Sequence, residues 1–490
     1  MTKTHVLANA LALCLAQPYS HAQTLITPLQ LRMAYEWTAP APMADASSPA
    51  TLRAEDLLRS AIQAAPSAAG CTLAEFDTTS VLSLERALEW MLCRSPNMRQ
   101  ALAAVNEQTA GLRLADLAWR PQVNLSAERA SNRIPISNNG SSALSESLTG
   151  SVGLSWVLFD FGARSAGLEQ ARLSLASALA AQDANTLASL RDALKIYVEA
   201  AAARAKLDVQ EQALRLAAQS AGAARAKYAA QVASLSEKLQ AETALAQATL
   251  ERVRAQGNWR SAAAALAVAM GLRANTELLL PAPETAFAEW TDDSLDAADM
   301  ERIRNEHPRI RALRADAQAL AARLDAVRAD GRGSLSLSGS LAATRALGVG
   351  NGGFDRSVNT SLLATIPLFN GAQQAARELQ VQSQISAREA LVQAAERELD
   401  IALAQAVVQL QIEQENQTAS RAFLSTAQQG FEVALGRYKA GVGSIIELLT
   451  AQAALSTGQA QWQQAKIARA NAQIGLALTA GRLGPSSQRR

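Results

Sequence analysis

The sequence predicts a mainly α-helical protein built as a tandem duplication, in which each copy carries one long helical hairpin and two β-strands. Three observations support this fold class. Residues 438–455 repeat a phrase found at 228–245 with a constant offset of 210, including a Tyr and a Ser-x-x-Glu. The regions 162–228 and 372–438 each run for 67 residues without proline. Aromatic residues are only 4% of a chain that is 49% hydrophobic, which is typical of alanine-rich helices packed side by side.

The N-terminus has the features of a secretory signal. Lys3 gives a positive start, residues 6–16 are apolar, and Ala22 is a small residue at a suitable cleavage position. We therefore expect residues 1–22 to be removed. Cys14 lacks the small preceding residue that lipid attachment requires, which argues against a lipoprotein.

The mature chain keeps two cysteines, Cys71 and Cys93. In an oxidising compartment we expect them to form a disulfide, which would stabilise the protein by about 3 kcal/mol. Two buried free thiols are the alternative. Residues 23–80 contain several prolines and are interpreted as an N-terminal extension.

The duplication sets the expected domain bounds. Beyond the doubled phrase, the phrase at 156–162 matches 366–372, again with an offset of 210, and 120–126 matches 332–338 with an offset of 212. In each copy we expect a helix, two strands around a loop rich in Gly, Asn and Ser, and then the long hairpin. The predicted parts are a first repeat at 81–272, a linker at 273–297, a second repeat at 298–483 and a C-terminal tail at 484–490, with the first helices at about 83–118 and 298–330.

The predicted strands alternate between apolar and small polar residues. Residues 334–341 place leucines on one face and serines on the other, and residues 151–158 and 358–366 follow the same period. This alternation fits a half-buried soluble hairpin and a membrane barrel strand with a wet interior equally well.

The long helices distinguish these alternatives. Each would extend roughly 100 Å at about 1.5 Å per residue. Apolar residues at seven-residue spacing form coiled-coil seams at Leu173, Ala180, Leu187, Leu194 and Ala201, and at Ile385, Val392, Leu399 and Ala406. A soluble rod or bundle has no use for four alternating strands at one end of its helices.

Four strands cannot close a membrane barrel alone. Lipid does not tolerate open sheet edges, and the smallest closed barrels have about eight strands. Several copies of the chain must therefore share one barrel. Two, three or four chains would supply eight, twelve or sixteen strands, and the strand pattern does not choose between them.

The phrases at 159–162, 369–372 and 437–452, together with the duplication, resemble the TolC-like outer-membrane factors over most of residues 80–483. The resemblance implies a homotrimer in the outer membrane of a Gram-negative bacterium. Twelve strands would close a β-barrel, and twelve helices would continue it as a periplasmic α-barrel.

The same resemblance implies a function and partners. The chain would be the passive exit duct of a tripartite export system, in contact with outer-membrane lipid, a periplasmic adaptor (membrane fusion protein) and an inner-membrane transporter of the ABC or RND type. Residues 84–102 also resemble outer-membrane components of type I protein secretion. The expected cargo is therefore a type I secreted protein or a small toxic compound.

The doubled phrase is interpreted as the turn of each hairpin at its periplasmic end. Gly441 and Gly443 permit the backbone to turn, and Ser444 is a suitable N-cap for a capping box completed by Glu447. The first copy repeats the cap without the glycines. The predicted tip residues, expected to contact the adaptor, are Gly441, Val442, Gly443, Ser444, Val232 and Ser234.

Two roles are open for the glutamates of the doubled phrase. Capping alone accounts for both Glu237 and Glu447. The resemblance implies in addition that a residue matching Glu447 lines the closed tunnel entrance, where three chains would gather six carboxylates and favour cations. A second acidic position of the family is Thr450 here and Gln240 in the first copy, so we expect a weaker acidic ring.

Catalytic chemistry is not expected. The sequence lacks zinc-protease, serine-hydrolase and phosphate-loop motifs, and His307-Pro308 is interpreted as a bend at a helix start. We expect no cofactor and no metal, and the net charge of +2 gives no indication of a nucleic-acid partner. The alternative function is a periplasmic coiled-coil adaptor or scaffold without a pore. Adaptors usually combine one helical hairpin with soluble β-domains, which argues against it.

Overall fold

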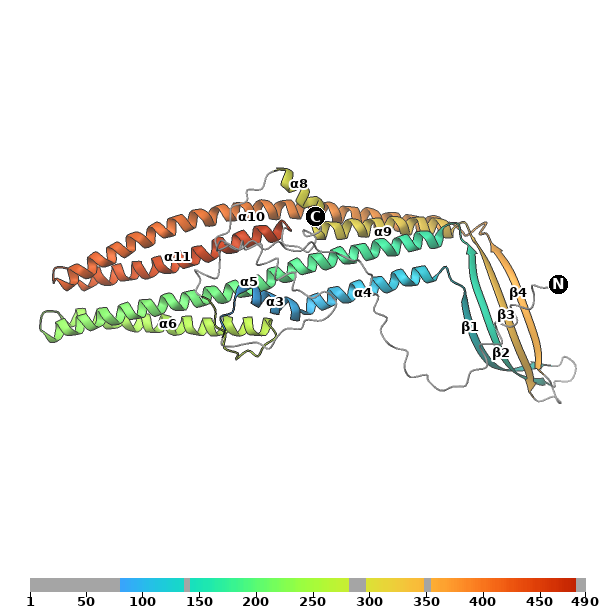
Figure 1. Ribbon diagram of the computed structural model, residues 1–490, viewed down its shortest axis with the longest axis horizontal. Coiled ribbons are helices and arrows are strands. Elements are labelled where there is room, and N and C mark those ends of the chain that lie inside the picture. Colours follow the sequence, from blue (N-terminus) through green and yellow to red (C-terminus); the bar gives the residue numbers. More distant parts are fainter. Residues whose placement is uncertain (1–79, 136–141, 282–296, 348–353, 482–490) are drawn as a thin grey trace, which may run out of the picture. The chain divides into compact units, whose positions relative to one another are not determined.

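The computed structural model describes residues 80–135, 142–281, 297–347 and 354–481, which form two repeats of one element order (Figure 1). The first repeat contains α3 (Leu84–Arg94), α4 (Pro96–Leu117), β1 (Gln122–Pro135), β2 (Ser142–Phe159), α5 (Ala163–Ala229) and α6 (Leu235–Ala269). The second contains α8 (Ala297–Glu306), α9 (Pro308–Asp330), β3 (Ser334–Leu347), β4 (Phe354–Thr365), α10 (Gln373–Lys439) and α11 (Ile445–Thr479). The expected signal, the N-terminal extension up to residue 79 and the C-terminal tail lie outside the described residues.

The long helices agree closely with the sequence. Both α5 and α10 are 67 residues long, and both α6 and α11 are 35 residues long. Of the predicted seams, Ala180, Leu187, Leu194 and Ala201 are buried on α5, and Leu399 is buried on α10. None of the described helices is long and apolar enough to cross a membrane.

The first helix of each repeat is broken, and here the expectation of single helices at 83–118 and 298–330 is wrong. The breaks fall at Ser95-Pro96 and His307-Pro308, where the residue before proline is extended, with ψ of 124° in both cases. Proline disfavours helical geometry in the residue before it and is itself well placed at the first turn of the next helix. The chain therefore ends one helix and starts another.

The four strands form one antiparallel sheet in the order β1-β2-β3-β4. The pairing of β2 with β3 joins the two repeats. The strands are 14, 18, 14 and 12 residues long, which is longer than the segments in which the sequence shows alternation. Figure 1 shows the strands gathered at one end of the long helices and the two hairpin turns at the other.

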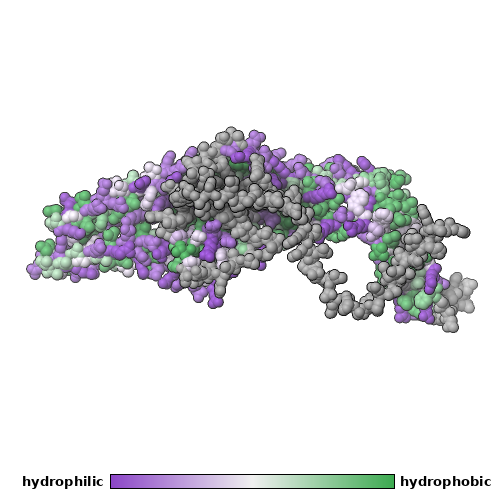
Figure 2. All heavy atoms as spheres, in the orientation of Figure 1, coloured by the Kyte–Doolittle hydropathy of each residue, from purple (hydrophilic) through white to green (hydrophobic). Residues whose placement is uncertain are grey.

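The register sorts side chains onto two faces. One cross-strand row places Leu125, Val152, Leu341 and Val358 side by side, and all four are at least 40% exposed. The neighbouring row on the other face carries serines, of which Ser126 and Ser151 share a hydrogen bond of 2.7 Å. Figure 2 shows hydrophobic residues over the strands next to the helices. The sheet thus has one apolar face, which the described residues do not cover, and one polar face.

A strand-to-helix junction anchors the sheet to α5. Arg164 Nε lies 2.6 Å from Asp160 Oδ2, and the guanidinium also donates to the carbonyl of Val157 at 2.7 Å. The same guanidinium stacks 4.3 Å from the ring centroid of Trp119, which precedes β1. Trp156 Nε1 in turn donates to the Trp119 carbonyl at 3.0 Å. These contacts fix the direction in which α5 leaves β2.

The two repeats also pack through their helices. α5 contacts α9 and α11 of the second repeat as well as α4 and α6 of its own. Tyr197 lies fully buried in the main core cluster and donates to the carbonyl of Leu82 at 3.3 Å. α9 is held against α10 by ion pairs, including Arg314–Glu396 at 2.7 Å. The helices therefore form one packed unit that spaces the hairpin turns far from the sheet.

Candidate functional site

The turn between α10 and α11 has the geometry that its glycines predict. Gly441 has a φ of +80°, and the N–H groups of Val442 and Gly443 both donate to the Arg437 carbonyl at 3.0 Å. A Cβ on Gly443 would lie 2.9 Å from Arg437 Cβ and from the Tyr438 nitrogen. Gly441 is therefore required by conformation, and Gly443 by lack of space.

The turn between α5 and α6 reproduces this backbone without glycine. Gln231 occupies the position of Gly441 and has a φ of +63°. The N–H of Val232 closes the turn on the Lys227 carbonyl at 2.9 Å. A left-handed conformation costs a non-glycine residue about 1–2 kcal/mol. The first turn is thus more strained than the second.

The serine caps are confirmed, but the expected capping box is only half formed. Ser234 and Ser444 accept hydrogen bonds from the N–H groups of Glu237 and Glu447, at 3.2 and 3.1 Å. The Glu447 carboxylate does not return to its cap and lies 3.1 Å from Arg437 Nε across the turn. A guanidinium is a stronger partner for a carboxylate than a backbone N–H. Both side chains are about half exposed, so the pair contributes at most about 1 kcal/mol.

The ends of the two hairpins are joined by residues that the sequence did not identify. Lys227 at the end of α5 donates from Nζ to the Tyr438 carbonyl, and its ammonium lies 3.9 Å from the centroid of the Tyr438 ring. Burial raises the pKa of the Tyr438 hydroxyl, and the nearby Glu237 carboxylate raises it further. The Tyr438 hydroxyl has no hydrogen-bond partner among the described residues. The only sequence signal was that Tyr438 belongs to the doubled phrase.

A small core lies beneath the tips. Tyr438, Ile445 and Leu448 are almost fully buried and pack with Ala221, Ala224 and Ala241 of the first hairpin, together with Phe431, Ala434 and Leu455. One turn further from the tips, Ser220 Oγ donates to Gln452 Oε1 at 2.9 Å in a buried contact between α5 and α11. The turn after α5 and the turn after α10 are therefore held side by side within a single chain. Together they form one surface at this end of the helices, which we call the end surface.

That end surface is rich in exposed apolar side chains. Val232 is 76% exposed and Val442 is 69% exposed, although both are large hydrophobic residues. Leu235, Leu239 and Ile446 are each more than 50% exposed beside them. Exposed apolar groups gathered at one surface are typical of interaction sites. The predicted tip residues thus lie together and are accessible.

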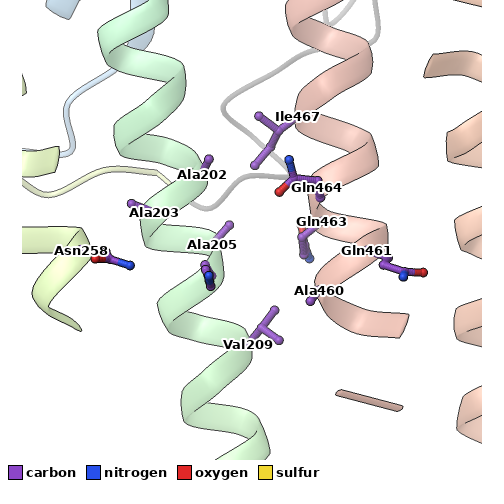
Figure 3. Close-up of a pocket in the computed structure, with 11 residues that line it drawn as sticks. Ala202, Ala203, Ala205, Val209, Asn258, Ala460, Gln461, Gln463, Gln464 and Ile467 are labelled. Atoms are coloured by element: carbon purple, nitrogen blue, oxygen red, sulfur yellow. The ribbon is translucent and has the colours of Figure 1, made fainter. Parts of the chain in front are cut away.

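A separate groove lies between the hairpins, closer to the middle of the helices (Figure 3). It has a volume of about 430 Å³ and is lined by alanine, aliphatic and amide side chains of α5, α6 and α11, such as Ala202, Ile467 and Gln463, together with Lys206. Its lining offers no pair of titratable groups for acid–base chemistry. Within the described ranges no cluster of three His, Cys, Asp or Glu residues is placed to hold a metal ion.

The structure tests the disulfide prediction only at Cys93. Cys93, on α3, is disulfide-bonded. Cys71 lies outside the described residues, so the pairing of these two cysteines stays a prediction. The expected bend at His307 is the break that opens α9, and the imidazole there is half-buried.

A family model described as outer membrane efflux protein matches the chain twice, over residues 87–272 and 300–482. The chain belongs to the outer membrane efflux protein family. The family match shows that the chain is an outer-membrane efflux or secretion channel that extends into the periplasm. An adaptor without a pore is not favoured.

Relatives and solved structures agree with this family. Protein CyaE of Bordetella pertussis is 33% identical over 427 residues, which cover 87% of this chain and 89% of that protein. Nodulation protein T of Rhizobium leguminosarum bv. trifolii is 24% identical and covers 77% of this chain and 81% of its own length. The solved structure of CusC has a TM-score of 0.71 at 19% identity, covering 84% of this chain and 95% of that one. The solved structure of VceC of Vibrio cholerae has a TM-score of 0.67 at 19% identity, covering 81% of this chain and 96% of that one.

The family's fold explains the surfaces that a single chain leaves exposed. In this fold three chains share one β-barrel that continues into a helical barrel. The edges of β1 and β4 then find partners in neighbouring chains. Apolar residues of α10 are also exposed in a single chain, among them Leu379, Leu391, Ile401, Val408 and Val433. Family members work with adaptors and inner-membrane transporters, and these relatives are channels rather than enzymes.

Proposed function

We propose that this channel is the outer-membrane component of a type I protein secretion system and conducts its cargo passively. The observation that carries the proposal is the similarity to Protein CyaE at 33% identity along nearly the full length of both chains. The resemblance of residues 84–102 to secretion components supports the same branch. The transporter in such a system is of the ABC type, and it supplies the energy.

The exposed end surface is the proposed docking site for the periplasmic adaptor. Val232 and Val442 project from the two turns, and the small core beneath them keeps both turns in place. Because neither side chain is buried, an aspartate at either position would remove apolar contact with the adaptor without disturbing folding. We expect Val232→Asp/Val442→Asp to lose the adaptor in copurification while the trimer stays intact.

The two glutamates are proposed to form a weak cation-selective ring at the tunnel entrance. Glu447 is partly neutralised by Arg437 at 3.1 Å. Glu237 lies near Tyr438 and raises the pKa of its hydroxyl. Each chain would thus supply two carboxylates to the ring, and one of them, that of Glu447, would be shared with the Arg437 guanidinium.

Single-channel recording in planar bilayers tests the ring. Glu447→Gln should reduce block by divalent cations, and Arg437→Gln should strengthen it because the carboxylate is released. Glu251→Gln, which alters an exposed carboxylate of α6 paired with Arg254, is the matched control. Unchanged cation block in Glu447→Gln would reject the gating role and leave the ion pair with Arg437 across the turn as the function of this carboxylate.

Secretion itself tests the larger proposal. Copurification of the full-length trimer from its own cells should recover an ABC transporter and an adaptor, and deletion of the channel should leave a protein cargo inside the cell. Recovery of an RND transporter, together with sensitivity to small toxic compounds on deletion, would assign the channel to drug or metal efflux instead.

A further inference from the structure

The apolar face of the sheet ends in a group of arginines. Arg129, Leu148, Arg345 and Phe354 form one cross-strand row on this face, at the end of the strands that is remote from the helices. Arg356 lies on the same face in the adjacent row, opposite Ala343. Figure 2 shows hydrophilic residues appearing toward this end of the sheet. We call Arg129, Arg345 and Arg356 the arginine border.

The charges at this end are sorted by face. Glu128 and Asp355 fall in a row with Thr149 and Thr344, which belongs to the polar face. On the apolar face Arg129 pairs with Glu146 at 3.2 Å. Arg345 stacks 5.7 Å from the Phe354 ring, and neither it nor Arg356 has a carboxylate partner in the described parts of the chain. Two like charges on neighbouring strands repel each other unless an anion lies between them.

The height of the border matches the edge of the membrane. Ten residues separate Leu335 from Arg345 along β3, which is roughly 34 Å of strand at about 3.4 Å per residue. A strand tilt of about 40° leaves roughly 26 Å along the membrane normal, and the apolar band of outer-membrane barrels is about 25 Å tall. The helices leave the sheet on the periplasmic side, so the arginine border lies at the level of the outer-leaflet headgroups.

We propose that Arg345 and Arg356 bind the phosphate groups of the glycolipid in the outer leaflet. Guanidinium groups form bidentate hydrogen bonds with phosphate, and this chemistry is stronger at the edge of an apolar region than in water. The leucines and valines below the border contact the acyl chains of the same lipid. The site recognises lipid and not the exported cargo, so it does not depend on the type I assignment.

Lipid binding to the purified full-length trimer tests the proposal. Native mass spectrometry would compare lipid A carrying two phosphates with dephosphorylated lipid A of identical acyl chains. The wild-type trimer should retain the phosphorylated lipid, and Arg345→Gln/Arg356→Gln should bind it about tenfold more weakly or worse. Arg345→Lys/Arg356→Lys keeps the charges and should bind within about threefold of wild type.

Two further arms complete the test. Arg311→Gln/Arg323→Gln removes two charges from α9, outside the sheet, and should leave lipid binding unchanged. Millimolar inorganic phosphate should fail to displace the lipid, because the acyl contacts are part of the site. Equal retention of both lipids by the wild type, unchanged binding by the glutamine variant, or complete displacement by free phosphate would overturn the proposal. If the glutamine variant does not assemble, the comparison of phosphorylated with dephosphorylated lipid A on the wild-type trimer still tests the proposal.

Discussion

The ammonium of Lys227 lies 3.9 Å from the ring centroid of Tyr438, although 211 residues separate them in the sequence. This contact joins the end of α5 to the end of α10 and holds the two hairpin turns of one chain together. Any movement that opens the tunnel by separating the hairpins must break it. The contact therefore stabilises the arrangement in which the two turns lie together.

Lys227→Met should make opening easier, because methionine keeps an apolar stem in place but removes the cation. A partly buried cation–π contact contributes about 1 kcal/mol, which would favour the open state by about fivefold. Single-channel conductance or open probability in bilayers would measure the change. Lys238→Met is the matched control, since Lys238 stacks on Tyr228 within one hairpin, at 5.3 Å. Equal effects of the two variants would contradict a specific role for Lys227.

Gly443→Ala should destabilise the second turn by about 1–3 kcal/mol, because its Cβ would enter occupied space. Gly430→Ala lies inside α10 with nothing within 4 Å of the new Cβ, and should stabilise the helix by up to about 1 kcal/mol. The temperature at which the trimer dissociates on gels would measure both. A Gly443→Ala variant as stable as wild type would show that the turn can adjust.

Asp160→Asn should weaken the strand-to-helix junction by about 2 kcal/mol, because a charge-assisted hydrogen bond to Arg164 is lost. Burial raises the pKa of Asp160, but the side-chain and backbone hydrogen bonds from Arg164 outweigh it and hold the pKa below its usual value. The stabilisation is thus present above pH 4 or so and is lost as pH falls further. The wild-type advantage in unfolding temperature should be larger at pH 7 than at pH 3. Asn370 occupies the matching position in the second repeat, so Asn370→Ala is a control for polarity alone.

His307→Gln should reduce the sensitivity of the protein to mild acid. Burial lowers the pKa of His307, and the charges of Arg309 and Arg191 lower it further. The unfolded chain, with a histidine pKa near 6.5, then binds more protons than the native protein, so stability falls as pH drops below that value. The difference in unfolding temperature between pH 7.5 and pH 5.5 should be smaller in the variant. An unchanged difference would mean that other groups control the acid response.

The sequence predicted those parts of the fold that depend on local signals. The bounds of α5 and α10 agree to within one residue, because both regions lack proline and end at turns. The strand faces were also predictable, since alternation needs no knowledge of neighbours. Ser234 and Ser444 cap their helices as expected because a cap involves residues only three positions apart.

The remaining features depend on packing between distant segments. Lys227 meets Tyr438 only because α5 and α10 end at the same level, which no local pattern encodes. The Glu447 carboxylate pairs with Arg437, which lies on the other side of the turn, and not with the cap three residues before it. The prolines at 96 and 308 were visible in the sequence, but each first helix was predicted as one continuous element, and the structure breaks it at these residues.

The pairing of β2 with β3 repeats, between the two halves of one polypeptide, the antiparallel pairing found inside each half. Six separate half-length ancestors would therefore supply the same wall as three fused chains. Gene fusion lowers the rotational symmetry from sixfold to threefold and frees alternate positions to diverge. Two such divergences are Gln231 against Gly441 and Asp160 against Asn370. They allow the two repeats of each chain, which alternate around the trimer, to acquire different functions.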